Sequence, residues 1–392
     1  METNTTEHVI SARTALRFVV LIGIVSLFAD MTYEGARSIN GPYLAILGAS
    51  GTVVGVVSGL GELIGFSIRL VSGYLSDKTK SYWTITFFGY AINLIAVPLL
   101  ALAGNWQLAA LLMVIERIGK GIRVPPRDAM LSYATQHMGR GWGFGLHEAL
   151  DQLGAILGPL VMASVLFFRD GYKTAYGILL IPTLLALGIL ATARFMYPRP
   201  QDLEFSQTRL QVQGFSKTFW LYVLATALIA AGFADFPLIA YHFQKASVAD
   251  PVMIPILYAV AMGVDAIAAL VFGRLFDRLG LSTMMLVAVL SAFFAPLVFF
   301  GNFSLALLGM ALWGIGMGTQ ESIMRAAIAG MISPEQRGLA YGLFNTVYGI
   351  SWFLGSVLIG VLYDVSIPWL VAFSVIAQLA SIPIFYFIRK QV

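Results

Sequence analysis

Apolar segments long enough to cross a membrane follow one another along almost the whole chain. A helix of about 20 residues, rising ~1.5 Å per residue, spans the ~30 Å hydrocarbon core of a bilayer. The segments 86–104 and 281–300 are apolar on every side, whereas the strands of a membrane barrel alternate apolar and polar residues. The sequence therefore predicts an all-α integral membrane protein and excludes both a soluble enzyme and a transmembrane β-barrel.

The composition is that of a chain surrounded by lipid. Hydrophobic residues make up 58% of the 392 residues and charged residues only 11%, against about 25% charged residues in soluble domains. The chain contains no Cys, which excludes disulfides, thiolate nucleophiles and metal or redox sites built on Cys.

Hydropathy, with breaks at Gly, Pro and charged residues, predicts twelve transmembrane helices. Their expected ranges are 16–36, 43–70, 82–103, 106–126, 142–167, 174–196, 217–241, 252–274, 281–300, 303–330, 339–363 and 368–388. The polar segment 1–15 lacks the pattern of a cleavable signal peptide, so we expect it to remain as a cytoplasmic N-terminal segment.

The basic residues are divided unequally between the two predicted sides of the membrane. Termini and connections on one side hold sixteen Lys and Arg, and those on the other side hold four, namely Arg37, Arg169, Lys173 and Lys245. By the positive-inside rule, both termini are expected in the cytoplasm, as in a multi-pass protein of the cytoplasmic membrane. The basic residues are thus a topology signal, and no nucleic-acid partner is expected.

The second half of the chain repeats landmarks of the first. Three residues recur after 200 positions, each set in a predicted cytoplasmic loop after an even-numbered helix: Gly73, Asp77 and Lys78, then Gly273, Asp277 and Arg278. Arg140 recurs as Arg337, and Phe28-Ala29-Asp30 resembles Phe233-Ala234-Asp235. Such a parallel duplication predicts two pseudo-symmetric six-helix bundles, at 16–196 and 217–392, joined by a cytoplasmic linker at 197–216.

With these motifs the chain resembles transporters of the major facilitator superfamily over essentially its whole length. The duplicated Gly73-x-Leu75-x-Asp77-Lys78 motif resembles the superfamily's cytoplasmic signature, and Arg117-x-x-x-Gly121 resembles its proton-coupling motif. Gly154-x-x-x-Gly158-Pro159 resembles the antiporter motif, although Met162 and Ala163 replace two glycines of that motif. The run from Gly119 to Ala129, Gly-Lys-Gly-Ile-Arg-Val-Pro-Pro-Arg-Asp-Ala, resembles a bacterial and archaeal subgroup. The resemblance implies that helices one, four, seven and ten line a central path.

Nine of the 20 acidic residues lie inside the predicted spans: Asp30, Glu34, Glu62, Glu116, Glu148, Asp151, Asp235, Asp265 and Glu321. A charge at such a position costs about 2.5–3.5 kcal/mol on insertion scales, so each is a candidate for function. Asp30 and Glu34 stack at i, i+4 on one helix face, where two carboxylates repel and favour the uptake of a proton. We expect Asp30 and Asp235 to face the substrate, and Glu34 to carry a proton or to pair with Arg37.

Helices four and five carry a second group of candidates. Arg117 is expected to pair with Asp151 at a similar depth, and such a pair can be loosened by protonation of the acid. His147, Glu148 and Asp151 lie on one face of helix five, as a metal or proton site or as a packing cluster. The pattern lacks the second His of a zinc-protease helix.

The other candidates are substrate contacts and gates. Tyr33, His242 and Asp265 are candidate substrate or metal contacts, and His242 could also lie in the membrane interface. Glu321 stacks one turn from Arg325, which predicts a salt bridge or an inner gate. The repeated loop residues, together with Arg140 and Arg337, are predicted to latch one conformation, with Asp77 and Asp277 as the anchors.

The sequence therefore predicts a secondary active transporter that moves a small solute by alternating access, with the proton gradient as energy source, no cofactor and a monomeric state. It contains no phosphate-binding Gly-x-x-x-x-Gly-Lys-Ser/Thr loop and no nucleophile motif of an enzyme. The intramembrane acids favour efflux of a cation, a metal or a drug-like compound by antiport. The alternative is proton-coupled import of an anionic solute or a siderophore-like metal chelate, held by residues such as Arg37, Arg69 and Lys120. A transport-dead receptor or scaffold is a remote alternative.

Overall fold

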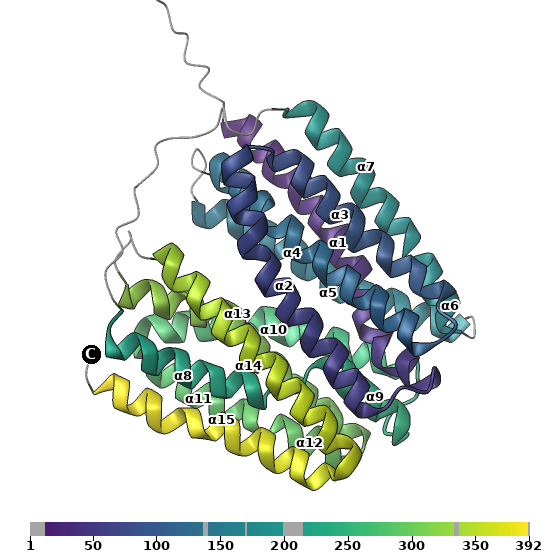
Figure 1. The fold of residues 1–392 in the computed structure, drawn as a ribbon, viewed down its shortest axis with the longest axis vertical. Coiled ribbons are helices and arrows are strands. Elements are labelled where there is room, and N and C mark those ends of the chain that lie inside the picture. The colour runs from purple at the N-terminus through teal and green to yellow at the C-terminus, as the bar shows by residue number, and fades with distance from the viewer. Residues whose placement is uncertain (1–11, 136–139, 169–170, 199–214, 333–336, 391–392) are drawn as a thin grey trace, which may run out of the picture.

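The computed structural model describes residues 12–135, 140–168, 171–198, 215–332 and 337–390, and these are almost entirely helical (Figure 1). The helices of the first half are α1 (Ala12–Ile46), α2 (Gly51–Thr79), α3 (Tyr82–Leu99), α4 (Trp106–Thr135), α5 (Arg140–Phe168), α6 (Tyr172–Ile178) and α7 (Leu180–Met196), with a 3₁₀ turn at Leu100–Leu102. Those of the second half are α8 (Lys217–Gly232), α9 (Phe236–Lys245), α10 (Met253–Leu279), α11 (Leu281–Ala292), α12 (Phe294–Phe300), α13 (Phe303–Met331), α14 (Arg337–Val365) and α15 (Ile367–Arg389).

Eleven helical segments of the described chain are long and apolar enough to cross a membrane. Four of these spans are composite, because α6 continues into α7, α8 into α9, α11 into α12, and α3 into the 3₁₀ turn. Helix α4 is 30 residues long and packs along α2 and α3, but several charged residues interrupt its apolar face. Composition therefore identifies every predicted span except the fourth, for which crossing of the membrane stays a prediction.

The helices form two groups, α1–α7 and α8–α15, which lie side by side (Figure 1). Within the first group α1 packs on α5 and α7, and α4 packs on α2 and α3. Within the second group α10 packs on α13, and α8 on α14 and α15. The groups meet along three seams, where α2 contacts α14, α5 contacts α10, and α1 contacts α9.

Glycines bring the backbones of α2 and α14 into contact. A Cβ at Gly55 would overlap the carbonyl oxygen of Ser356, and a Cβ at Gly59 would lie 2.8 Å from the Cβ of Ser356. Small residues at such a seam allow close approach of two helices without bulky side chains between them. The seam is therefore a close packing surface between the two groups.

The first two helices differ from their predicted ranges. Helix α1 runs to Ile46 rather than ending at 36, and α2 begins at Gly51 rather than 43. The predicted break rested on Arg37 and on Gly41-Pro42, but Arg37 is buried, and Gly41 packs so tightly on α9 that a Cβ would overlap the carbonyl oxygen of Pro237. These residues serve packing between the two groups instead of a turn.

The extended helices also change the charge count on which orientation was predicted. Arg37, assigned to the outer side, lies inside α1, and Arg123 and Arg127, assigned to the inner side, are buried within α4. The number of loop Lys and Arg thus falls by one on the outer side and by two on the inner side. The inner side still holds the larger number. The orientation of the termini stays a prediction.

The seventh predicted helix is broken near its middle. Helix α8 ends at Gly232 and α9 begins at Phe236, whereas the sequence predicted one helix over 217–241. The side chain of Asp235 caps α9 by accepting a hydrogen bond from the backbone N–H of Phe236 at 2.9 Å, and Pro237 follows in the first turn. An N-cap Asp followed by Pro is a typical helix start, so the sequence contained a signal for this break.

Candidate functional site

A cavity of about 630 Å³ lies between the two helix groups. Helices α1, α2, α4 and α5 line it from one side, and α10, α13 and α14 from the other. Its charged lining residues are Asp30, Glu34, Arg37, Glu62, Arg69, Lys120, Arg123, Arg127, Asp128, Glu148, Asp151, Asp265 and Glu321. The cavity thus gathers many of the charges that the sequence placed inside apolar helices.

The helices that line the cavity differ in part from those that the family resemblance implied. Helices one, four and ten contribute as expected, but among the described residues helix seven, made of α8 and α9, contributes none. Helices two, five, eight and eleven contribute instead. In this conformation α9 packs against α1, which removes it from the cavity wall.

Buried polar contacts between the groups close the cavity at one end. Nη2 of Arg37 in α1 lies 2.5 Å from Oδ1 of Asp235, which caps α9. The hydroxyl of Tyr258 in α10 donates a hydrogen bond to Glu34 in α1 at 2.5 Å. Arg37 also lies 3.9 Å from Glu34 and 3.8 Å from Glu62. These contacts join α1 to both α9 and α10.

A second set of contacts joins the groups where α2 begins and α14 ends. Oδ1 of Asp364 accepts a hydrogen bond from the backbone N–H of Gly51 at 2.9 Å, and Oδ2 accepts bonds from the N–H and the hydroxyl of Thr52, each at 2.7 Å. An acidic side chain at a helix N-terminus satisfies free N–H groups and complements the helix dipole. Because the cap comes from the other group, it holds this end together. We call it the closed end.

The cavity opens toward the opposite end of the bundle. Three acidic residues of its lining are solvent-exposed there, namely Asp128 near the end of α4, Glu148 near the start of α5 and Glu321 in the second half of α13. With the predicted orientation of the termini, this end would face the cytoplasm.

Asp30 and Tyr33 lie in the cavity wall beside basic residues of α4. Oδ2 of Asp30 accepts a hydrogen bond from the Tyr33 hydroxyl at 3.0 Å, and Oδ1 lies 3.7 Å from Nη2 of Arg123. The ammonium group of Lys120 lies 3.9 Å from the centre of the Tyr33 ring, within the range of a cation–π interaction. These two residues are thus placed where a substrate contact was predicted.

Arg117 does not pair with Asp151, and this prediction was wrong. Arg117 lies 3.3 Å from Glu62 and 3.3 Å from Glu116, its neighbour in sequence. Its side chain runs along α2, where a Cβ at Gly61 would lie 2.9 Å from the Arg117 Cγ. The two partners were missed because equal depth in the membrane does not specify which way a helix face points.

Asp235 and His242 lie at the closed end rather than in the cavity wall. Asp235 is 3% exposed and engaged with Arg37, so the expectation that it faces the substrate is wrong for this conformation. His242 is buried, with Nδ1 3.1 Å from the Tyr363 hydroxyl and its ring 5.0 Å from that of Phe299. It packs between helices instead of lying in the membrane interface.

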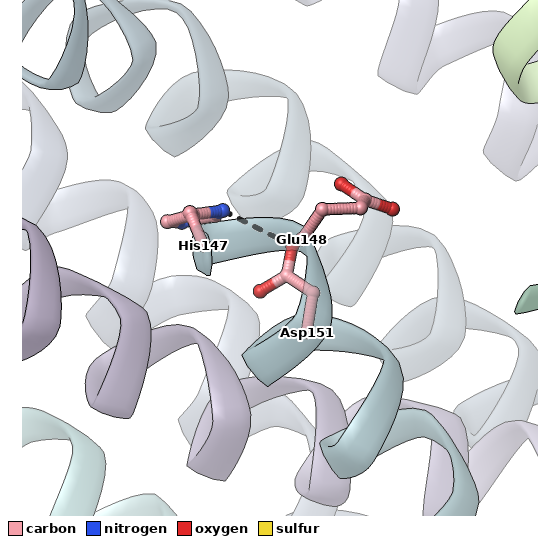
Figure 2. A group of neighbouring side chains, drawn as sticks. All are labelled: His147, Glu148 and Asp151. Atoms are coloured by element: carbon pink, nitrogen blue, oxygen red, sulfur yellow. Dashed lines mark ion pairs between the residues drawn. The ribbon is translucent and has the colours of Figure 1, made fainter. Parts of the chain in front are cut away.

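His147, Glu148 and Asp151 are close neighbours on α5 (Figure 2). All three belong to the cavity lining. Nδ1 of His147 lies 3.7 Å from Oδ2 of Asp151, and Nε2 lies 2.9 Å from the hydroxyl of Ser26. One donor atom from each of the three residues lies within 4.8 Å of the others. The Glu148 carboxylate points away from the His147 ring (Figure 2). His147 is buried and Glu148 is exposed, and a metal site, a proton site and a packing cluster all stay predictions for this group.

Asp265 and Glu321 approach the cavity from the second group. Asp265 is 2% exposed, and its Oδ1 has no hydrogen-bond partner among the described residues. A Cβ at Gly318 of α13 would lie 2.5 Å from this oxygen, so the two helices meet closely there. The side chain of Arg325 lies outside the described residues, and the predicted pair with Glu321 stays a prediction.

The repeated motif residues lie in the last turns of helices and not in loops. Gly73, Asp77 and Lys78 belong to α2, and Gly273, Asp277 and Arg278 belong to α10. The error arose because helices continue beyond the membrane core, where charged residues no longer mark their ends. Asp77 accepts a hydrogen bond from the Tyr82 hydroxyl at 3.2 Å, and Lys78 lies over the Tyr74 ring.

Asp277 and Arg278 are exposed, and the side chains of Arg140 and Arg337 lie outside the described part of the chain. The latch assigned to these residues therefore stays a prediction. Sequence reasoning gave no specific role to Asp364 or Tyr258, both of which hold the closed end. The position of Asp364 near the end of an apolar segment was a weak indication of a role. Nothing in the sequence distinguished Tyr258 from the other Tyr residues, 16 in all.

Comparisons with known proteins agree on one family. The family model described as Major Facilitator Superfamily matches residues 21–300 and 234–391. An uncharacterized protein of Mycobacterium tuberculosis, Rv2265, is 40% identical over 96% of this chain and 94% of its own length. An uncharacterized MFS-type transporter of Methanocaldococcus jannaschii, MJ1317, is 29% identical over 89% of each chain.

Solved transporter structures share the fold at low sequence identity. The nucleoside transporter NupG superposes with a TM-score of 0.76 at 16% identity, covering 95% of this chain and 98% of NupG. A POT family transporter in complex with a thioalcohol-conjugated peptide superposes with a TM-score of 0.73 at 11% identity, covering 95% and 96%. At these identities the similarity concerns the fold alone.

Proposed function

The chain belongs to the Major Facilitator Superfamily, and we propose that it is a secondary active transporter that moves a small charged solute across the cytoplasmic membrane by alternating access. Family and fold are those of transporters rather than enzymes. The observation that carries the proposal is a cavity lined with charges from both helix groups and closed at one end by contacts between them.

The transport cycle that we propose is a rocking of α1–α7 against α8–α15. In the inward-open state the contacts of Asp235 and Asp364 hold the closed end. In the outward-open state these contacts break, and the groups come together at the other end. In this scheme α4 also crosses the membrane, which brings the number of spans to twelve and places both termini in the cytoplasm. A monomer suffices, because the cavity is built from a single chain.

Proton coupling is part of the proposal. Carboxylates buried in apolar helices are costly unless they are paired or protonated, and Asp30, Glu34 and Asp265 all line the cavity. A carboxyl that faces water alternately from the two sides can load and release a proton in each cycle. Asp30 and Glu34 are the proposed proton carriers, because both are buried carboxyls of the cavity wall, one turn apart on α1.

The cargo is proposed to carry charge. Acidic residues of α5, α10 and α13 favour a cationic group and support efflux of a cation, a metal or a drug-like compound. One observation favours the alternative of an anionic solute, because Lys120 faces the cavity without a carboxylate within 4.0 Å among the described residues.

A disulfide across the closed end tests alternating access without knowledge of the cargo. The chain has no Cys, so Thr52→Cys with Asp364→Cys introduces a single pair at two residues in direct contact. Oxidation is expected to trap the inward-open state. A reporter group attached in the cavity should then be reached by a water-soluble reagent only from the cytoplasmic side.

Flux in proteoliposomes completes the test. A thermal-shift screen of metals, organic cations and carboxylates selects a solute, and an imposed pH gradient should drive its movement. Oxidation of the Cys pair should stop this flux, and reduction should restore it. Undiminished flux through the fully cross-linked protein would contradict the proposal, and a variant with only Thr52→Cys is the control for oxidation itself.

A further inference from the structure

Most charged side chains in the cavity wall have a polar partner. Asp30 lies near Arg123, Glu34 bonds to Tyr258, and Arg127 contacts Asp128. Asp151 contacts His147, and Glu148 forms a hydrogen bond with Gln152. Among the described residues, Lys120 and Asp265 are charged lining residues that have neither an ion pair nor a hydrogen bond through the charged group.

Lys120 belongs to the first helix group. It lies on α4, partly exposed, with its ammonium group over the Tyr33 ring. The cavity carboxylates of α1 and α2 are already engaged, Asp30 by Tyr33, Glu34 by Tyr258 and Glu62 by Arg117. An ammonium group held in this way at the surface of a cavity can receive an anionic group of a ligand.

Asp265 belongs to the second helix group. It is almost fully buried on α10, and the charged residues that act on it are Glu34 of α1, Glu148 of α5 and Glu321 of α13, all of them acidic. A buried carboxylate among like charges and without a donor is costly. A proton or the cationic group of a ligand removes that cost, so this part of the cavity selects positive charge.

Aromatic side chains of α14 form part of the same wall. Phe344, Tyr348 and Trp352 follow one another at four-residue spacing, with ring centroids 5.6 and 5.8 Å apart, and all three line the cavity. Such a row offers an apolar and π surface for the body of a ligand and adds to the attraction of a cation.

We infer that the cavity binds a zwitterionic solute, with the cationic group of the solute at Asp265 and its anionic group at Lys120. This inference rests on the proposed transport function and names its substrate class. A solute with one charge satisfies one of the two residues, whereas a zwitterion satisfies both and bridges the two helix groups. Binding would thus connect the halves that must move together in the cycle.

Binding to the purified full-length protein in nanodiscs tests the inference. The probes are three zwitterions, γ-aminobutyrate, ε-aminocaproate and phenylalanine, each compared with the amine and the carboxylate that match its skeleton. At least one zwitterion is expected to bind about tenfold more tightly than both matched compounds, a difference of about 1.4 kcal/mol. Calorimetry measures the affinities.

The variants Lys120→Gln and Asp265→Asn are each expected to abolish this preference, and Asp265→Glu to retain part of it. Asp250→Asn is the control: it removes the same charge from an exposed connection outside the cavity lining. Its preference for the zwitterion should be unchanged. Thermal unfolding of each variant identifies any that fail to fold, and if Asp265→Asn fails, Lys120→Gln, at a partly exposed position, decides the comparison.

The outcomes separate this inference from the proposed function. If no zwitterion is preferred over its matched amine and acid, or if both variants keep the preference, the inference is wrong, even where proteoliposomes carry a singly charged solute and the transporter proposal stands. If a zwitterion binds as expected but the cross-linkable protein shows no gated flux, the binding site stands and the proposed transport function fails.

Discussion

Arg37 in α1 and Asp235 at the start of α9 form a buried ion pair with 2.5 Å between Nη2 and Oδ1, although 198 residues separate them in the chain. The pair joins the two helix groups at the closed end. Asp235 also caps α9, so one carboxylate both begins a helix and binds the opposite group.

Asp235→Asn should therefore shift the protein away from the inward-open state. The change removes the counter-charge of Arg37 in a buried site, where loss of one partner typically costs about 3–5 kcal/mol. Because Asn can still cap α9, the effect should fall mainly on the contact between groups. Spin-label distances across the closed end should lengthen. Distances that match those of the unchanged protein would show that the pair does not hold this end.

Asp364→Asn should weaken the same end to a smaller extent. The variant loses the charge that complements the N-terminus of α2 and one of the oxygens that accept bonds from Gly51 and Thr52. Loss of a helix cap typically costs about 1 kcal/mol. The expected result is a smaller lengthening of the same spin-label distance, with Asp250→Asn, an exposed acid in a connection, as the control.

Gly41→Ala should disfavour the closed end through steric overlap alone. A Cβ at this position would coincide with the carbonyl oxygen of Pro237, which is backbone and cannot rotate away. Gly188→Ala in α7 is the matched control, because no atom lies within 4 Å of the added carbon there. Labelling of a Cys introduced at the closed end should increase for Gly41→Ala only. Equal labelling of both variants would mean that α1 and α9 do not pack as described.

Asp30→Asn should abolish proton-driven flux and preserve exchange. Asn keeps the shape of the side chain and can still accept a bond from Tyr33, but it cannot release a proton. Flux of the selected solute under a pH gradient is expected to fall to the level of empty liposomes, whereas exchange of the solute at equal pH continues. If the gradient still drives flux in this variant, Asp30 is not the proton carrier.

Much of the fold could be predicted from local sequence. Apolar segments of sufficient length indicated the spans, and the repeated residues around Gly73 and Gly273 indicated two related halves. The boundaries were predicted less well near Arg37 and Pro42, because the prediction placed the end of the helix at a charge and a Pro. Here the charge has partners from another helix and the adjoining Gly41 packs on α9, and neither fact is local.

The candidate site was predictable in its residue types but not in its pairings. That Asp30 and Glu34 share a helix face follows from their spacing, and both do line the cavity. That Glu34 meets Tyr258, and that Arg117 meets Glu62, depends on how each helix is rotated about its axis. Asp235, like Asp30, was expected to face the substrate. Because the helix breaks between α8 and α9, its side chain instead points to Arg37 at the closed end.

The sequence by itself determined that this chain lies in a membrane, that it is duplicated, and that it places charges where lipid would reject them. Hydropathy and residue spacing depend only on residues that are near one another in the chain, so the sequence alone is enough to determine them. Only the tertiary structure decided which of those charges neutralise one another and which, like Lys120 and Asp265, have no ionic partner among the described residues. That division depends on contacts a few ångströms long between helices far apart in the chain, because electrostatic and hydrogen-bond energies change steeply over such distances.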